Sequence, residues 1–152
     1  MKPQHWTHWI AVGFGSGLAP KAPGTFGSLA ALPLVVFAHI SLAPWFYLLF
    51  VTALFVLAVY CAERTQRDWQ CHDPGRIVID EWVGLALSYL LLPPQLLVWL
   101  AGFVLFRVFD IIKPWPIRWF DRHIKGGFGN VFDDVLAGVF TCVVLQLYFW
   151  FV

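Results

Sequence analysis

The stretch Arg107-Val-Phe-Asp-Ile-Ile-Lys-Pro-Trp-Pro-Ile-Arg118 follows a long apolar run and brings four charged residues together. Arg107, Asp110 and Lys113 are three residues apart, so a helix would carry them on one face as cation, anion and cation. The two prolines should end that helix, because proline disfavours helical backbone at the residue before it. Such a face is suited to binding a phosphate beside a metal ion. The alternative interpretation is a juxtamembrane loop stabilised by salt bridges, which would give the same pattern.

The composition indicates that lipid is the main solvent of this chain. Hydrophobic residues make up 60% of the 152 positions, charged residues make up 12%, and the mean hydropathy is +0.72. A soluble domain of this size needs far more polar surface. The length predicts one domain over residues 1–152. A net charge of +1 gives no general case for a nucleic-acid partner.

The apolar runs predict helical hairpins. Residues 29–60 as one helix would measure about 45 Å, too long for a hydrocarbon core of about 30 Å, so a hairpin that turns near Ser41–Pro44 is expected. Pro93-Pro94 divides residues 82–106 into halves of about 17 Å each. If these halves extend outward to about residues 75 and 112, each helix approaches 27 Å and the pair spans the membrane.

The predicted fold is therefore all-α: a membrane-embedded helical bundle built from helical hairpins plus a C-terminal span. Residues 135–152 form that last span, because they contain no charge. The second hairpin matters most for function, since it returns Asp110 to the side where Asp80 and Glu81 stand. A single straight span would place these acids on opposite faces of the membrane.

A second pair of acids, Asp133-Asp134, precedes the C-terminal span. Lys125-Gly-Gly-Phe-Gly-Asn130 is interpreted as a flexible glycine turn, with its asparagine as the N-cap and both acids in the first helical turn. A similar spacing between acids and glycine occurs twice: Gly84 follows Asp80-Glu81, and Gly138 follows Asp133-Asp134. A glycine one turn beyond the acids lets neighbouring helices approach closely at that level.

Residues 11–28 contain five glycines, two prolines, two serines and a threonine, and they predict a loop with exposed backbone N–H groups. The spacing matches neither a Walker loop nor a G-x-G-x-x-G fingerprint. The N–H groups and the Thr25 hydroxyl could bind an anion. The loop could equally be a plain connection in which Thr25 or Ser28 caps the next helix.

Five carboxylates are predicted at three helix ends, and hard oxygen ligands of this kind favour Mg²⁺; they are Asp80, Glu81, Asp110, Asp133 and Asp134. Carboxylates at a membrane boundary are costly and seldom lack a function. Plainer explanations exist for two of these acids. Asp133 could serve simply as a helix cap, and Glu81 could simply face the lipid headgroups. Arg107, Lys113 and Thr25 are the candidates to bind a phosphate.

A metal ion, cations and N–H groups together suit the hydrolysis of a phosphoryl group. Cys71 and Arg76 are separated by four residues, whereas the cysteine-phosphatase loop needs five, and no Asp-x-Asp motif is present. A metal-activated water therefore remains as the nucleophile, with one acid as the base. The pattern does not separate ligands from base among the catalytic candidates, which are Asp80, Glu81, Asp110 and Asp134.

Several stretches together carry a family pattern: Gly13–Pro20, Pro23–Leu29, His72-Asp73, Ile79–Glu81, Arg107–Arg122, and Gly126–Gly129 with Asp133-Asp134. In these motifs the chain resembles the phosphatidylglycerophosphatase A family over about residues 11–140. The resemblance implies an all-helical, Mg²⁺-dependent phosphatase that removes the terminal phosphate of phosphatidylglycerophosphate in a bacterial inner membrane. Arg118 is less general in that pattern, so it ranks below Arg107 and Lys113.

Two other classes of function remain as alternatives: a small ion or proton transporter, and a lipid-binding protein without catalysis. A transporter predicts acids near the middle of apolar runs, whereas these acids are expected at the ends. Eight of the ten basic residues lie in segments 63–81 and 107–134. The positive-inside rule therefore places these segments, and the active site, on the cytoplasmic side.

Overall fold

The computed structural model describes residues 2–71 and 75–151, and every regular element within them is helical. The predicted all-α class is thereby confirmed. The His72-Asp73 part of the family pattern lies outside the described residues. In chain order the elements are α1 (Trp6–Ala11), the 3-10 helix η1 (Gly13–Leu18), α2 (Pro23–Ser41), α3 (Pro44–Trp69), α4 (Ile79–Ser88), α5 (Leu96–Ile112), α6 (Ile117–His123) and α7 (Gly126–Phe151).

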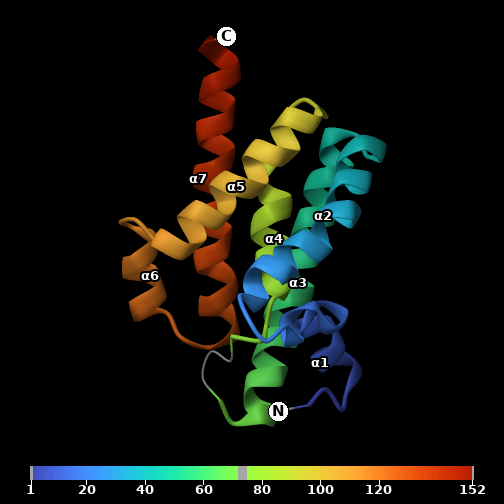
Figure 1. Cartoon of the computed structure of the whole chain (residues 1–152), viewed down its shortest axis with the longest axis vertical. Helices are drawn as coiled ribbons and strands as arrows, with labels where there is room; N and C mark the ends of the chain where they lie inside the picture. Colours follow the sequence, from blue (N-terminus) through green and yellow to red (C-terminus); the bar gives the residue numbers. More distant parts are fainter. Residues whose placement is uncertain (1, 72–74, 152) are drawn as a thin grey trace.

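Helix α4 is the centre of the bundle. It packs against α2, α3, α5 and α7, and its most extensive contact is with α7 (Figure 1). Nine of its ten residues are buried, including the two acids of its first turn. A helix that is apolar on all sides is expected inside a bundle rather than at its surface. The residues of α4 are therefore shielded from both lipid and bulk water.

The first hairpin forms as the sequence predicts. Helix α2 ends at Ser41 and α3 begins at Pro44, so the turn falls on the two residues between them. Proline suits the start of a helix, because the N–H that it lacks would have no partner within the helix there. Beyond the turn α4 packs against both α2 and α3 (Figure 1).

The second hairpin differs from the prediction, because α4 is too short to span a membrane. Its 10 residues measure about 15 Å, against the 27 Å or so expected. Before the helix, the backbone N–H of Val78 donates to the carbonyl of Ala11 at 2.8 Å, which holds this segment outside the helix. After it, the Tyr89 hydroxyl donates to the carbonyl of Trp99 at 2.8 Å and fixes the turn into α5.

The start of α7 also differs from the prediction. The helix begins at Gly126, so the expected flexible turn before Asn130 is wrong. The N–H of Gly127 donates to Glu63 Oε2 at 2.7 Å, and a Cβ atom on Gly127 would lie 2.7 Å from the Cα of Glu63. These glycines therefore allow α7 to pack closely on α3. As a result, Asp133 and Asp134 lie about two turns inside the helix.

The close approach predicted at Gly84 and Gly138 is confirmed, and the two glycines face each other between α4 and α7. A Cβ atom on Gly84 would lie 2.5 Å from the carbonyl oxygen of Asp134 and 2.5 Å from Phe106 Cε2. A Cβ atom on Gly138 would lie 3.0 Å from the carbonyl carbon of Gly84. The backbones of the two acid-bearing helices are therefore in direct contact.

Within the described residues, three helices, α2, α3 and α7, are long and apolar enough to cross a membrane. They support a membrane protein, and α7 is the candidate C-terminal span, as predicted. Four parts of the chain meet at one end of the bundle (Figure 1). They are the glycine-rich segment (residues 11–28), the C-terminal end of α3, and the N-terminal ends of α4 and α7. The candidate site is built at this end.

Candidate active site

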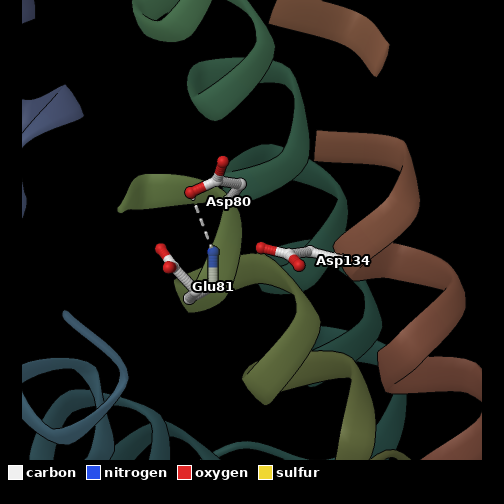
Figure 2. A group of neighbouring side chains, drawn as sticks. All are labelled: Asp80, Glu81 and Asp134. Atoms are coloured by element: carbon white, nitrogen blue, oxygen red, sulfur yellow. Dashed lines mark hydrogen bonds between the residues drawn. The ribbon is translucent and has the colours of Figure 1, made fainter. Parts of the chain in front are cut away.

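Three acids converge where α4 meets α7. Asp80 and Glu81 lie in the first turn of α4, and Asp134 reaches them from the third turn of α7 (Figure 2). One carboxylate oxygen from each of the three lies within 4.8 Å of the other two. The backbone N–H of Glu81 donates to Asp80 Oδ1 at 3.1 Å, which fixes the orientation of that carboxylate. The structure therefore brings together acids that are 54 positions apart in the chain.

These carboxylates are buried and repel one another. Asp80 is 7% exposed, Glu81 is 8% exposed and Asp134 is 4% exposed. Burial raises the pKa of Asp80 well above its usual range, and the charges of Glu81, Asp133 and Asp110 raise it further. Burial also raises the pKa of Glu81, to about 7, although Arg107 acts in the opposite direction. Burial and mutual repulsion therefore disfavour negative charge on Asp80 and Glu81, and a bound cation would offset this effect.

Arg107 and Asp110 border the acid cluster from α5. Arg107 Nη1 donates to Asp110 Oδ2 at 2.6 Å, as their spacing on one helical face predicts, and lies 3.7 Å from Glu81 Oε1. The same nitrogen donates to the Ser28 hydroxyl of α2 at 3.4 Å. Both side chains are largely buried. Arg107 therefore connects α5, α4 and α2 beside the three acids.

Lys113 does not continue the helical face of Arg107 and Asp110. It is the C-cap of α5 with a left-handed backbone (φ 46°), so its side chain leaves the helix before Pro114. Its ammonium group donates to Asp121 Oδ1 of α6 at 2.7 Å and to Asp133 Oδ2 of α7. Burial alone would lower the pKa of Lys113, but the two carboxylates outweigh burial and raise it. Lys113 thus joins the C-terminal end of α5 to α6 and to the third turn of α7.

The charges of the site do not balance among the described residues. Arg107 pairs with Asp110 and, at 3.7 Å, with Glu81, whereas Lys113 pairs with Asp121 and Asp133. Two cations therefore face six carboxylates, and Asp80 and Asp134 make no ion pair with a described residue. Within the described part of the chain, Glu81 Oε2 and Asp133 Oδ1 are also buried without a hydrogen-bond partner. Buried carboxylates are expected to be paired or to coordinate a metal. The donors fit a hard divalent cation.

The N-terminus of α2 lies against this cluster. A Cβ atom on Gly24 would lie 3.1 Å from Arg107 Nη2 and closer still to Glu81 Oε1, so a larger residue there would displace these two side chains. Thr25 lies in the same first turn and is partly buried. Ser28 is one turn further along, where its hydroxyl donates to the carbonyl of Gly24 at 2.9 Å. The positive end of a 19-residue helix therefore faces the site.

The plainer explanations for these residues are wrong. Asp133 does not cap α7, because the first turn of that helix contains no acid. Glu81 does not face headgroups, because it is buried. Neither Thr25 nor Ser28 caps α2, whose N-cap is Ala22, and Ala22 makes no side-chain capping bond. Asp133 instead binds Lys113, and Ser28 instead binds Arg107.

Sequence reasoning missed three contributors to the site. Asp121 binds Lys113, Ser28 binds Arg107, and the backbone at Gly24 contacts Glu81 and Arg107. All three residues fall inside the stretches that carry the family pattern, and that pattern was the signal available in the sequence. The partner of Ser28 depends on how α2 packs against α5, and no local pattern predicts it.

A sequence model of the phosphatidylglycerophosphatase A family matches residues 9–149, nearly the whole chain. The chain belongs to this family. A phosphatidylglycerophosphatase A of Escherichia coli is 46% identical over 140 residues, covering 91% of this chain and 80% of the relative. One of Haemophilus influenzae is 44% identical over 145 residues, covering 94% and 89% respectively.

A third relative, from Bacteroides thetaiotaomicron, has a provisional name as a phosphatidylinositol-3-phosphatase. It is 39% identical over 149 residues, covering 93% of this chain and 92% of the relative. No solved structure gives a significant match. Family membership establishes that this chain is a phosphatase of phospholipid metabolism, as the sequence predicts.

Proposed function

We propose that the protein is a Mg²⁺-dependent phosphatidylglycerophosphatase that hydrolyses the terminal phosphomonoester of phosphatidylglycerophosphate to phosphatidylglycerol and phosphate. The observation that carries the proposal is the buried triad of Asp80, Glu81 and Asp134, with oxygens within 4.8 Å of one another. It stands beside Arg107 and the N-terminus of α2. Family membership supports the substrate, and the donor set supports the metal.

Asp80, Glu81 and Asp134 would hold the magnesium ion, because their oxygens converge within 4.8 Å. Among the described residues only Glu81 of the three pairs with a cation, which is Arg107 at 3.7 Å. Oxygen ligands from carboxylates are what Mg²⁺ prefers. Magnesium, when bound, would neutralise phosphoryl oxygens and activate water. Asp110 and Asp133 would complete the negative site at its edge, where Arg107 and Lys113 fix their positions.

The substrate phosphate would lie between the triad and the positive end of α2. Arg107 supplies a guanidinium group there, Thr25 supplies a hydroxyl, and the first turn of α2 supplies backbone N–H groups. Arg107 Nε is buried without a hydrogen-bond partner among the described residues, so one donor is free for this purpose. Lys113 contributes positive charge from the opposite side while it remains bound to Asp121 and Asp133.

Hydrolysis at this site requires one carboxylate to take a proton from water. The water oxygen bonds to phosphorus, the bond from phosphorus to the glycerol oxygen breaks, and that oxygen receives a proton as phosphatidylglycerol leaves. Asp110 is the best-placed base, because it lies outside the triad and Arg107 fixes its orientation at 2.6 Å. Buried surroundings strengthen each of these electrostatic contacts.

We place the protein in the bacterial inner membrane with the site on the cytoplasmic side. The support is the positive-inside rule, since the basic segments 63–81 and 107–134 include the site. The proposed partners are the lipid substrate and the membrane itself, without nucleic acid.

The decisive experiment measures phosphate release by the purified protein in detergent. Phosphatidylglycerophosphate should be hydrolysed with Mg²⁺, and a chelator should abolish release. Phosphatidylinositol 3-phosphate, suggested by the name of the third relative, serves as the competing substrate. Faster release from that lipid would overturn the substrate assignment, and full activity in chelator would overturn the metal.

The two rival functions make different predictions in this assay. A transporter or a non-catalytic lipid-binding protein would release no phosphate under any condition. The position of the acids does not exclude a transporter, since Asp133 and Asp134 lie inside α7 rather than at its end. Family membership favours the phosphatase.

A further inference from the structure

Helix α6 has an outer face that the catalytic site does not use. The helix lies at the edge of the bundle against the first turns of α7 (Figure 1). Its inner face is well packed, because Ile117 is fully buried and Phe120 stacks edge-on with Phe132 at 5.3 Å between ring centroids. Asp121 on the inner side binds Lys113. The outer face therefore needs a separate explanation.

That outer face combines tryptophan with basic residues. Trp115 is 81% exposed and Trp119 is 48% exposed. Arg118, Arg122 and Lys125 are exposed beside them. Tryptophan is enriched where a membrane meets water, since its ring is apolar while its N–H still needs a polar partner.

The charge of this segment is distinct from the rest of the chain. Residues 113–125 carry four basic residues and one acid, a net charge of +3, whereas the whole chain carries +1. The single acid, Asp121, faces inward to Lys113. Outward-facing charge in the segment is thus entirely positive. The chemistry complementary to this face is a surface that is both anionic and partly apolar.

The position of α6 supplies the second argument. The helix follows α5, which ends at Ile112, and precedes α7, a candidate membrane span that begins at Gly126. A short helix that directly precedes the start of a span is expected near the level of the lipid headgroups. Anionic headgroups attract nearby Lys and Arg side chains.

We propose that the outer face of α6 and its flanking residues binds the anionic headgroup layer of the membrane; this face consists of Arg118, Trp119 and Arg122 of the helix, with Trp115 before it and Lys125 after it. The contact goes beyond the proposed hydrolysis, because it involves bulk lipid rather than the substrate.

The test places an environment-sensitive fluorophore on the outer face. His123→Cys, in a background without native cysteines, is labelled and the protein is inserted into nanodiscs. One set contains phosphatidylcholine alone, and the other contains phosphatidylcholine and phosphatidylglycerol in equal parts. The label should shift to the blue and lose its quenching by iodide only with phosphatidylglycerol. High salt should reverse both changes, because it screens exposed charges.

A charge variant and a matched control complete the experiment. Arg122→Gln with Lys125→Gln removes two charges, which corresponds to about thirtyfold weaker attraction, so the response should be lost. The control, Arg64→Gln with Arg67→Gln, removes two exposed charges from the end of α3 and should respond like the parent. The proposal is overturned if the label ignores lipid charge, if salt has no effect, or if both double variants behave alike.

Discussion

The contact between Gly84 and the backbone of Asp134 predicts that one added methyl group will damage the site. In Gly84→Ala the new Cβ atom would lie 2.5 Å from the Asp134 carbonyl oxygen and from Phe106 Cε2. An ordinary contact begins at 3.4 Å, so α4 and α7 must separate by about 1 Å. Those helices carry the two halves of the carboxylate triad, and their separation widens the site directly.

Two opposing terms decide the effect of this change on stability. Overpacking in a close-packed interior costs about 1–3 kcal/mol. Replacing glycine by alanine within a helix returns about 1 kcal/mol. The free energy of unfolding should therefore fall by about 0–2 kcal/mol, a change that leaves the protein folded. Turnover should fall about a hundredfold, because a displacement of about 1 Å at reacting groups has an effect of that size.

The assay compares phosphate release, the Mg²⁺ concentration for half-maximal rate, and thermal unfolding in detergent. Val139→Ile is the matched control, since it adds one carbon to the exposed face of α7 one residue beyond Gly138. The control should behave like the parent protein. If Gly84→Ala keeps normal turnover at the parental Mg²⁺ requirement, the spacing of α4 and α7 does not set the geometry of the site.

Three further predictions follow from the same site. Asp80→Asn and Asp134→Asn should each lower turnover by orders of magnitude. Thermal stability without Mg²⁺ should hold or rise, because repulsion between buried acids is relieved, and the stabilisation added by Mg²⁺ should shrink. Normal turnover at saturating Mg²⁺ would exclude these acids as ligands. Arg107→Ala and Lys113→Ala should weaken substrate binding and turnover far more than Lys21→Ala, and a larger effect at Lys21 would move the phosphate to the glycine-rich loop. Single cysteines at Ser41 and Gln95, in a cysteine-free background, should label from the side opposite to one at Lys125, and labelling of Gln95 and Lys125 from the same side would refute the topology.

The sequence predicts those features that depend on local pattern. The first hairpin, the end of α5 before Pro114 and the close approach at Gly84 and Gly138 follow from turn residues and glycine spacing, and all three occur. The start of α7 was predicted wrongly for a physical reason. Glycine next to a span is typical of both a flexible turn and a tightly packed helix, and only the contact of Gly127 with Glu63 distinguishes them.

The pairing of Lys113 was also beyond local reasoning. Its spacing from Asp110 predicts a shared helical face, but the left-handed backbone at Lys113 redirects the side chain to Asp121 and Asp133. A proline after the lysine ends the helix, but it does not specify where the next segment goes. That direction is set by the packing of α6 on α7, which involves residues 117 and beyond.

The short length of α4 explains why the acids are where they are. Hydropathy cannot separate a helix buried in protein from one buried in lipid, because both are apolar on all sides. Ser88 and Tyr89 are the polar residues at the end of α4 that favour a helix buried in protein, since their hydroxyls need hydrogen-bond partners. They donate to the carbonyls of Gly84 and Trp99. A helix that is enclosed by its neighbours can hold Asp80 and Glu81 away from both lipid and bulk water. Asp134 of α7 completes the cluster. It reaches the other two acids because α4 and α7 touch at Gly84 and Gly138, where a Cβ atom would not fit.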